Sequence, residues 1–495
     1  MQYDAIVVGS GVAGMTAAVT LSREGRSTLV LEQASHPGGL MQTFVRGGVR
    51  FPTGVHLVGS LGEGEVLWRY LKYAGVLDRL RLVRMDPSGF LRLKLGQTDF
   101  VMPCGRETLR ERLLERFPAE AGGIDRFMSD MASTAKDFAL YNIEARPDML
   151  PLAAMQHSLK EYLDCITDCA ELRAILTALN PFYGVGPGEC PLYAHFLVLD
   201  SFLSSAWRID ESDVTFVQAF EDALAQFGGE IRSGALVTAV ETAGGEVAAV
   251  RLADGERIEA CTILFTGHPK QLLQLCSDGA LRPAYRNRVS GLEDTISFCG
   301  VAAIVEGLDR PPQCCNSFIY ADLDTERQYG LHTIANSLPP HGVFSSMWPV
   351  GDGRHALMAL ATSDYSEWEA WTSSRTGARP GDYEDVKRAA AERILAFVKS
   401  NGLESARVRL VDCFSPLTLR DYTLTPSGSA YGVKKTMGAL SAARISAVTR
   451  VKGLYLAGQS MVLPGVVGTV ISSIDACGAI MGHERLIARV LEATS

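Results

Sequence analysis

Three glycine-rich segments carry the residues whose types and spacing point to chemistry. The first, Gly9-Ser-Gly-Val-Ala-Gly14, follows a short apolar run and opens a helical pattern. In this spacing Gly9 makes a tight turn, Gly11 lets the backbone approach a pyrophosphate, and Gly14 lets the helix pack closely on the strand. The helix start at Val12 and Ala13 offers unpaired N–H groups and a partial positive charge to phosphates. This segment predicts a dinucleotide site.

The second segment distinguishes between two dinucleotides. An apolar run at 27–31 ends at Glu32, which is placed to accept hydrogen bonds from the ribose hydroxyl groups of an adenosine. Gln33 follows, and then Gly38-Gly-Leu-Met41 leads to Thr43. A glycine pair after the ribose-binding acid, followed by threonine, resembles the extension found in FAD enzymes of the glutathione-reductase-like superfamily. We therefore expect FAD as the cofactor.

The third segment lies near the other end of the chain. A strand pattern at 451–457 delivers Gly458 and Gln459, and Leu463-Pro-Gly-Val-Val-Gly468 then enters a helix. This arrangement fits contact with the ribityl chain and the flavin pyrimidine, where a helix N-terminus stabilises negative charge on the reduced ring. We therefore expect the two ends of the chain to fold together around one FAD.

The periodicity predicts an α/β fold built on a Rossmann-type FAD-binding domain. This domain is expected to be discontinuous (1–60, 205–290 and 440–495), with a helical lid or substrate region at 61–204 that includes one helix over 159–179. Residues 291–439 are expected to form a β-rich substrate domain with a helix at 382–400. The aromatic residues of the helical region suit the wall of a long apolar cavity, although ordinary core packing explains most of them: Phe182, Tyr183, Tyr193, Phe196, Phe202 and Trp207.

Several stretches near the two ends carry a family resemblance. They are Phe44-x6-Phe51-Pro-Thr-Gly54-Val-His56, Ser415-Pro-Leu-Thr418, Gly428-Ser-Ala-Tyr431-Gly432 and Ala457-Gly-Gln459. Residues 1–60 and 415–482 resemble the phytoene-desaturase-related flavoenzymes, and most of all the branch of carotenoid isomerases and retinol saturase. Ser415–Thr418, with Gly428–Gly432 after it, resembles the substrate-side strand and turn of that branch. The chain departs from the pattern at Leu40, where many relatives have arginine, and at Pro52, where an acid is usual.

Together, the three segments and the resemblance imply one set of FAD-binding residues. Within it, Val237 would contribute a backbone contact beside the adenine. The expected set is Gly9, Gly11, Val12, Ala13, Gly14, Glu32, Gln33, Gly38, Gly39, Leu40, Met41, Gly54, Val55, His56, Val237, Gly267, Gly458, Gln459, Gly465, Val466, Val467 and Gly468.

The resemblance also implies candidates for catalysis. It places His56 beside the flavin ring, where the imidazole could hold the flavin or the substrate, or move a proton; a purely supporting histidine is the alternative. Tyr431 and Tyr422 could face the substrate or donate a proton, or could be plain wall residues. Arg420 could balance charge on a reduced flavin or a polar substrate end, or could be an ordinary ion-paired arginine. The other eight histidines show no metal spacing, so no metal site is expected.

The resemblance favours redox chemistry on a conjugated polyene, with reduction of a C=C bond by hydride from the flavin and NADPH as a candidate external reductant. Ring closure coupled to hydride delivery on a polyketide-type polyene is a variant of this reaction. Desaturation, cis–trans isomerisation and amine oxidation are the alternatives within enzymes. A flavin-bound lipid carrier without catalysis is the alternative from another class.

Composition narrows the partners. The chain has 495 residues and a net charge of −9, which argues against nucleic acid on electrostatic grounds. Eleven scattered cysteines, with no signal-peptide pattern, predict reduced thiols in a cytoplasmic protein. Peripheral membrane contact stays open as an expectation, because an apolar substrate is implied.

Overall fold

The computed structural model describes residues 2–143, 154, 156–277, 279–308, 316–324, 326–327, 338–437 and 445–495. Its first seven-stranded sheet has the order β10-β2-β1-β13-β12-β11, and β19 pairs with β13. The strands are β1 (Gln2–Val8), β2 (Thr28–Leu31), β10 (Glu230–Arg232), β11 (Val237–Ala243), β12 (Glu246–Leu252), β13 (Arg257–Phe265) and β19 (Leu454–Leu456). Strands β10, β2, β1, β13 and β19 run parallel to one another, and the pairs β12–β13 and β11–β12 are antiparallel.

The register of the parallel strands brings distant parts of the chain to one sheet edge. Val8 lies opposite both Leu31 and Phe265, and Phe265 lies opposite Leu456. The carboxyl ends of β2, β1, β13 and β19 therefore end side by side, which is the edge where open α/β sheets bind ligands.

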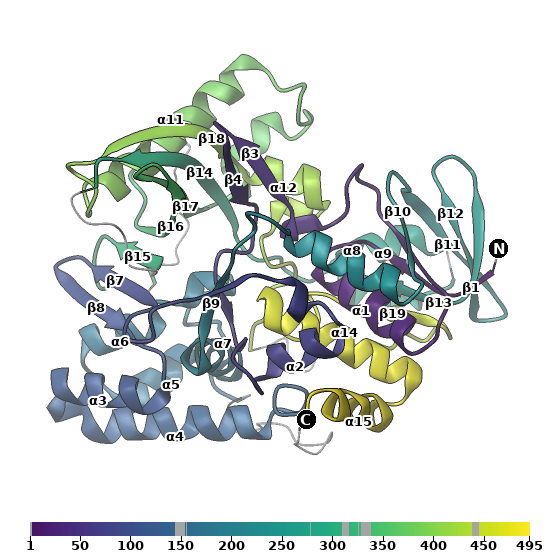
Figure 1. Ribbon diagram of the computed structural model, residues 1–495, viewed down its shortest axis with the longest axis horizontal. Coiled ribbons are helices and arrows are strands. Elements are labelled where there is room, and N and C mark those ends of the chain that lie inside the picture. The colour runs from purple at the N-terminus through teal and green to yellow at the C-terminus, as the bar shows by residue number, and fades with distance from the viewer. Residues whose placement is uncertain are drawn as a thin grey trace.

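Helices from both ends of the chain pack beside this sheet. α1 (Val12–Arg23) lies next to α14 (Gly465–Met481), and the Ser473 hydroxyl donates a hydrogen bond of 3.0 Å to the Ala13 carbonyl. α15 (His483–Ala493) follows α14, and α8 (Phe216–Gln226) packs against α1 (Figure 1). The α/β fold with a Rossmann-type unit is confirmed.

The second sheet has the order β18-β14-β17-β16-β15-β7-β8 and lies on the other side of the molecule from β10–β12 (Figure 1). α11 (Gly381–Lys399) covers one of its faces through a core that includes Trp368, Tyr383 and Ile394. The strands are β7 (Leu91–Leu95), β8 (Thr98–Met102), β14 (Ser297–Glu306), β15 (Asn316–Tyr320), β16 (Gly342–Gly351), β17 (Arg354–Ser363) and β18 (Arg407–Phe414).

The region expected to be mostly helical, 61–204, also contains strands at 82–102 that the sequence analysis did not predict. This stretch contains β6 (Leu82–Arg84) and the β7–β8 hairpin, and β7 joins the second sheet as a parallel neighbour of β15. Buried and exposed residues alternate along β7, so the two-residue period of a strand was present in the sequence. The helices of the block are α2 (Val66–Tyr73), α3 (Arg106–Arg116), α4 (Ala121–Asp137), α5 (Leu159–Ile166), α6 (Ala170–Thr177) and α7 (Leu192–Ser204).

Two further predictions about elements need correction. The single helix expected over 159–179 is broken, because Thr167 is extended and its hydroxyl accepts the N–H of Cys169 at 3.0 Å. The substrate-side strand expected at 415–418 is a helix instead. There β18 ends at Phe414 and the Ser415 side chain caps α12 (Pro416–Thr423).

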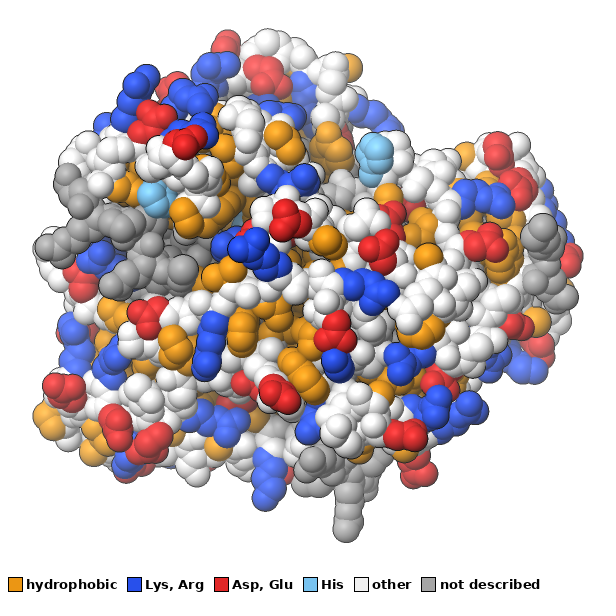
Figure 2. Space-filling view, viewed as in Figure 1, with side chains coloured by type: hydrophobic (Ala, Val, Ile, Leu, Met, Phe, Trp, Pro, Cys, Tyr) orange, Lys and Arg blue, Asp and Glu red, His pale blue; other side chains and the backbone are white. Residues whose placement is uncertain are grey.

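No helix within the described ranges combines the length and the apolar character that a bilayer crossing requires. On the face drawn in Figure 2, acidic and basic side chains are interspersed over both the helical block and the sheets. The described part of this face therefore carries no extended basic field of the kind that follows a nucleic-acid backbone.

Candidate functional site

The loop between β1 and α1 forms the first wall of the site. Gly9 has φ +101°, and a Cβ atom at Gly14 would lie 1.8 Å from the Gly9 carbonyl oxygen, so only glycine fits at Gly14. A Cβ atom at Gly11, in contrast, meets no atom of the described residues within 4 Å beyond its chain neighbours. The loop is thus closely packed on one side and bare on the other, as a pyrophosphate-binding backbone must be.

Glu32 ends the second strand beside this loop and is buried. Its Oε2 accepts hydrogen bonds from the Ser10 N–H (3.0 Å) and the Ser10 hydroxyl (2.6 Å), and its Oε1 accepts from the Ala34 N–H (2.8 Å). The Ser10 hydroxyl also accepts the Gly38 N–H at 2.9 Å. Ser10 therefore connects the loop after β1, Glu32 at the end of β2 and the glycine pair that begins at Gly38. Ser10 is not among the predicted site residues, because the glycine motif sets no residue type at this position.

The glycine pair lies directly on the first loop. A Cβ atom at Gly39 would lie 3.3 Å from the Gly11 Cα atom, and Gly39 has φ +52°. A Cβ atom at Gly38 would lie 2.3 Å from a methyl group of Val217 in α8, and Met41 is buried. Gly38 and Met41 therefore support this loop from behind.

The C-terminal segment closes the site from the opposite side. Gly458, with φ +129°, follows β19, and its N–H donates to the Ser472 hydroxyl of α14 at 3.0 Å. Gly465 starts α14 with φ +77°, and a Cβ atom at Gly468 would lie 2.4 Å from the Leu463 carbonyl oxygen. The N-terminus of α14 thereby faces the loop of Gly9 across a common space.

These loops enclose a cavity of about 560 Å³, here called the cradle, within the size range of ligand sites. Sixteen of the residues expected to bind FAD line it: Gly9, Gly11, Val12, Ala13, Glu32, Gln33, Gly39, Leu40, Gly54, Val55, Val237, Gly267, Gly458, Gln459, Gly465 and Val466. The sequence analysis missed other lining residues, among them Thr266, His268 and Gln271. Thr266 had a usable signal, because it follows a buried strand at the ligand-binding edge of the sheet.

A second, smaller cavity of about 160 Å³ adjoins the cradle and is here called the aromatic cavity. Phe182 is part of its wall, and the Phe182 ring centroid lies 4.9 Å from that of Phe318 and 5.2 Å from that of Phe344. Of the wall residues expected from the helical block, Phe182 and Phe202 line this cavity, whereas Tyr183, Tyr193, Phe196 and Trp207 pack elsewhere. The described lining residues include no Asp, Glu, Lys or Arg.

The two cavities share part of their walls. The common residues come from the glycine-pair loop, the segment before His56, the segment around Tyr431 and the start of α14: Leu40, Gly54, Val55, Ala430, Tyr431, Gly465 and Val466. Three further residues expected to bind FAD, namely His56, Val467 and Gly468, line the aromatic cavity only. A cradle walled by glycine-rich loops and an apolar, aromatic cavity thus meet at one short boundary.

His56 is buried at this boundary, and neither of its ring nitrogens has a hydrogen-bond partner among the described residues. Its ring centroid lies 6.1 Å from that of Phe344. Burial lowers the pKa of His56 to about 4, so the imidazole is neutral near pH 7. An unpartnered buried polar group is costly, which indicates that a bound molecule contacts it.

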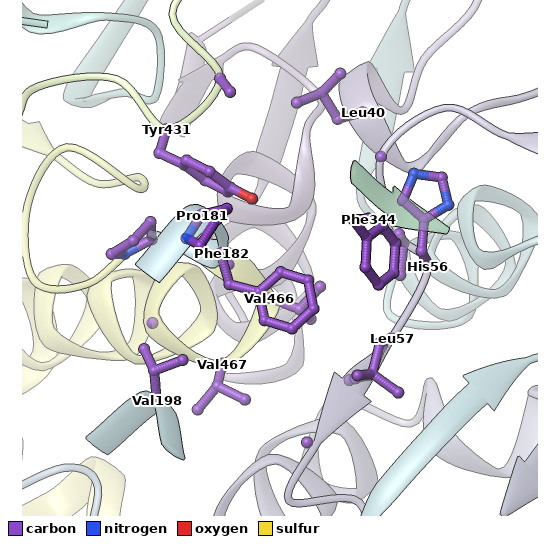
Figure 3. Close-up of a pocket in the computed structure, with 18 of the residues that line it drawn as sticks. Leu40, His56, Leu57, Pro181, Phe182, Val198, Phe344, Tyr431, Val466 and Val467 are labelled. Carbon is purple, nitrogen blue, oxygen red and sulfur yellow. The ribbon is translucent and has the colours of Figure 1, made fainter. Parts of the chain in front are cut away.

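Tyr431 faces His56 from the opposite wall, with its hydroxyl directed into the cavity (Figure 3). Its ring packs edge-on against Phe298, and its N–H donates to the Thr295 hydroxyl at 3.0 Å. Burial raises the pKa of Tyr431 well above its usual range, so the hydroxyl keeps its proton.

The other two catalytic candidates lie elsewhere. Tyr422 lies at the rim of the cradle and is 64% exposed. Arg420 lines neither cavity. Its guanidinium donates to Asp421, to the carbonyls of Thr372 (2.7 Å) and Ser374 (2.8 Å) and to the Tyr365 hydroxyl. Arg420 therefore ties α12 to the segment before α11, and the structure gives it no place beside a flavin or a substrate.

Comparison with known proteins agrees with this geometry. The family described as flavin containing amine oxidoreductase matches residues 12–481. The chain belongs to this family. Within the family it is related to the branch that resembles phytoene desaturase, as two kinds of relative show. It is 26% identical to human all-trans-retinol 13,14-reductase over 97% of this chain and 86% of the relative. It is 25% identical to the prolycopene isomerase of Arabidopsis thaliana over 92% of this chain and 79% of the relative.

Solved structures share the fold of this flavin oxidoreductase. An oxidoreductase from Methanosarcina mazei gives a TM-score of 0.65 at 16% identity and covers 96% of this chain and 99% of its own. Putrescine oxidase gives a TM-score of 0.64 at 16% identity, with coverages of 97% and 99%. Family membership thus identifies the chain as an FAD-dependent oxidoreductase, and the cradle is the part of the structure that fits its cofactor.

Proposed function

We propose that this protein reduces a C=C bond of a conjugated polyene that lies in the aromatic cavity against FAD held in the cradle. The observation that carries the proposal is the shared wall. A cavity lined by phenylalanines, without a charged side chain among the described lining residues, adjoins a dinucleotide cradle at Val55 and Tyr431, with His56 next to Val55. A long, apolar, conjugated molecule suits such walls, because its surface is flat and carries few polar atoms.

The residues of the cradle fit FAD in detail. Gly11 and Gly465 present bare backbone to the cavity, and the N-termini of α1 and α14 both point a partial positive charge into it. Glu32 is fixed by Ser10 and Ala34 and retains lone pairs for ribose hydroxyls. We assign the pyrophosphate to the loop of Gly9 and the flavin end to the boundary with the aromatic cavity.

The relatives support the substrate class. Those matched over most of this chain are named for reduction of all-trans-retinol and for isomerisation of prolycopene. Both molecules are conjugated polyenes. An amine substrate, as in putrescine oxidase, is less suited to the aromatic cavity, because a protonated amine needs a carboxylate or a dense set of carbonyls.

In this proposal the residues at the boundary divide two tasks. When bound and reduced by an external donor such as NADPH, the flavin supplies a hydride to one carbon of the double bond. Tyr431 gives its hydroxyl proton to the other carbon and recovers a proton from solvent, which completes a two-electron reduction. His56, held neutral, orients the substrate or the flavin through its unpartnered nitrogens.

A second candidate reaction is cis–trans isomerisation, which the prolycopene isomerase relatives favour. The same residues would then act without net electron transfer. Desaturation is the reverse redox direction at the same site. Ring closure on a polyketide-type polyene is a narrower form of the reduction, in which the hydride-accepting chain folds back on itself inside the cavity.

Anaerobic mixing tests these alternatives. The reductase predicts that NADPH or dithionite bleaches the visible flavin band and that retinol then restores it, with a product two mass units heavier than retinol. An isomerised product of unchanged mass favours the second candidate. A flavin that no polyene reoxidises, and a polyene that is recovered unchanged, would show a lipid carrier and refute the proposal.

A histidine substitution tests the proposed boundary. We expect His56→Ala to retain FAD and to slow flavin reoxidation by retinol about tenfold or more. His36→Ala is the matched control, because His36 is exposed and lines neither cavity. Equal rates in the two variants would remove His56 from the mechanism.

A further inference from the structure

One part of the aromatic cavity differs from the rest because it ends on a polar cluster. Tyr141 lines this cavity, and its hydroxyl donates a hydrogen bond of 2.9 Å to Asp200 Oδ2. Asp200 is only 1% exposed and is ion-paired with Arg106. No sequence motif indicates this cluster, because its members lie in three separate segments.

The cluster lies away from the boundary with the cradle. Tyr141 lines the aromatic cavity but not the cradle, and Val198, which precedes Asp200 by two residues in α7, lies in Figure 3 on the side of the cavity opposite Leu40. A molecule that reaches from Tyr431 through the phenylalanines would therefore place its far end near Tyr141.

The backbone holds this cluster in an unfavourable conformation. Five described residues other than glycine have positive φ, and two of them adjoin it: Ser60 with φ 58° and Leu140 with φ 72°. The Leu140 carbonyl accepts the Tyr70 hydroxyl at 2.7 Å, and the Ser60 N–H donates to the Ser201 carbonyl at 2.9 Å. Strain of this kind persists where surrounding contacts impose it, and it gathers at binding sites.

The direction of the hydrogen bond defines what the cluster can bind. Burial and the charge of Asp200 raise the pKa of Tyr141 well above its usual range, so the phenol stays protonated. Its proton points to Asp200, and of its two lone pairs the hydrogen bond with Ser60 uses at most one. Tyr141 can therefore accept a hydrogen bond from a ligand. A carboxylate would bring no proton, and on the Tyr141 side of the cluster it would approach Asp200 Oδ2, whereas Arg106 pairs with Asp200 Oδ1.

We infer that the Tyr141–Asp200–Arg106 cluster recognises a neutral terminal hydroxyl group on a long apolar substrate. The inference rests on the proposed function in that the aromatic cavity holds the substrate. It adds a selection among polyenes: alcohols are preferred to hydrocarbons, and hydrocarbons to carboxylates, at the end remote from the reacting bond. The alcohol is preferred because its hydroxyl donates a hydrogen bond to Tyr141. The carboxylate is disfavoured because its charge has the same sign as that of Asp200.

Equilibrium binding to the flavin-loaded protein tests the inference without turnover. The ligands are retinol, deoxyretinol (in which hydrogen replaces the terminal hydroxyl) and retinoic acid, and the readout is quenching of tryptophan fluorescence. We expect retinol to bind about three- to tenfold more tightly than deoxyretinol, and retinoic acid to bind most weakly. Tyr141→Phe should weaken retinol alone by the same factor. Asp200→Asn should strengthen retinoic acid about tenfold relative to retinol.

Tyr162→Phe is the matched control. The Tyr162 hydroxyl also donates to an aspartate, Asp130, at 2.7 Å, and Tyr162 lines neither cavity. It should leave all three affinities unchanged. Equal affinities for retinol and deoxyretinol, or a Tyr141→Phe variant that weakens both ligands equally, would overturn the inference. Selective binding without polyene reduction would refute the proposed reaction and leave this inference standing.

Discussion

The cradle and the aromatic cavity adjoin each other but differ in which part of the chain forms their walls. The cradle is made mainly of backbone, with glycines at turns where a Cβ atom would collide or would fill the ligand space, as at Gly14 and Gly11. The aromatic cavity is made of side chains, and its phenylalanines come from the helical block and from the second sheet. Backbone sites need specific residue types at fixed spacings, whereas side-chain cavities need only apolar bulk delivered from several elements.

The largest expected effect separates the two regions completely. Gly14→Ala places a Cβ atom 1.8 Å from the Gly9 carbonyl oxygen, so the loop must move. We expect flavin content, measured as the ratio of visible to protein absorbance, to fall roughly a hundredfold or more. Gly122→Ala is the control: Gly122 lies in α4, and its Cβ atom meets no atom of the described residues within 4 Å. A Gly14→Ala protein that retains its full content of bound flavin would contradict the assignment of the cradle.

A pair of tyrosines sharpens the comparison at the boundary. Tyr431→Phe removes the proposed proton donor, and we expect flavin reoxidation by a polyene to slow by about 10²- to 10⁴-fold while flavin content stays normal. Tyr422→Phe alters an exposed side chain at the rim of the cradle and should leave the rate within about twofold. Stopped-flow absorbance measures both. Similar rates for the two variants would exclude Tyr431 as the donor.

Truncation of the aromatic wall tests whether the second cavity is also a structural core. Phe344 contacts Phe182, Phe318 and His56 and is 5% exposed. We expect Phe344→Ala to lower the free energy of unfolding by roughly 3 kcal/mol, and to weaken polyene binding, while flavin content stays close to normal. Loss of flavin in parallel with stability would mean that the two regions do not act separately.

The smallest expected effect is a pH dependence of stability. Because the pKa of His56 is about 4 in the folded protein and about 6.5 when unfolded, the unfolded chain binds the extra proton first as pH falls. The contribution of His56 is fully present above pH 6.5 and is lost by pH 4, at a cost of about 3 kcal/mol or less. Denaturant titrations at a series of pH values measure the free energy of unfolding. Between pH 6.5 and pH 4 this free energy should fall less steeply in His56→Phe than in the wild type. Identical slopes would place the protonation elsewhere.

The same contrast explains what the sequence could predict. The glycines around Gly9, Gly39 and Gly465 were identifiable because the turns and close approaches require them. The sequence left two roles open for Arg420, at the site or in an ordinary ion pair, because its carbonyl and hydroxyl partners at 365–374 come together only in the folded chain. Tyr141 was overlooked for the same reason. Its role depends on Asp200 in α7 and on Arg106 in α3, and no spacing between such residues is fixed in advance.

The pairing of β13 with both β1 and β19 has a consequence for biosynthesis. The loop after β1 is synthesised well before β19 and α14, which form the other side of the cofactor site. The cradle therefore stays open while the intervening helices and the second sheet are synthesised and fold. We therefore expect the flavin to bind late in the maturation of this chain. The βαβ unit is synthesised first, and its partners β19 and α14 follow much later.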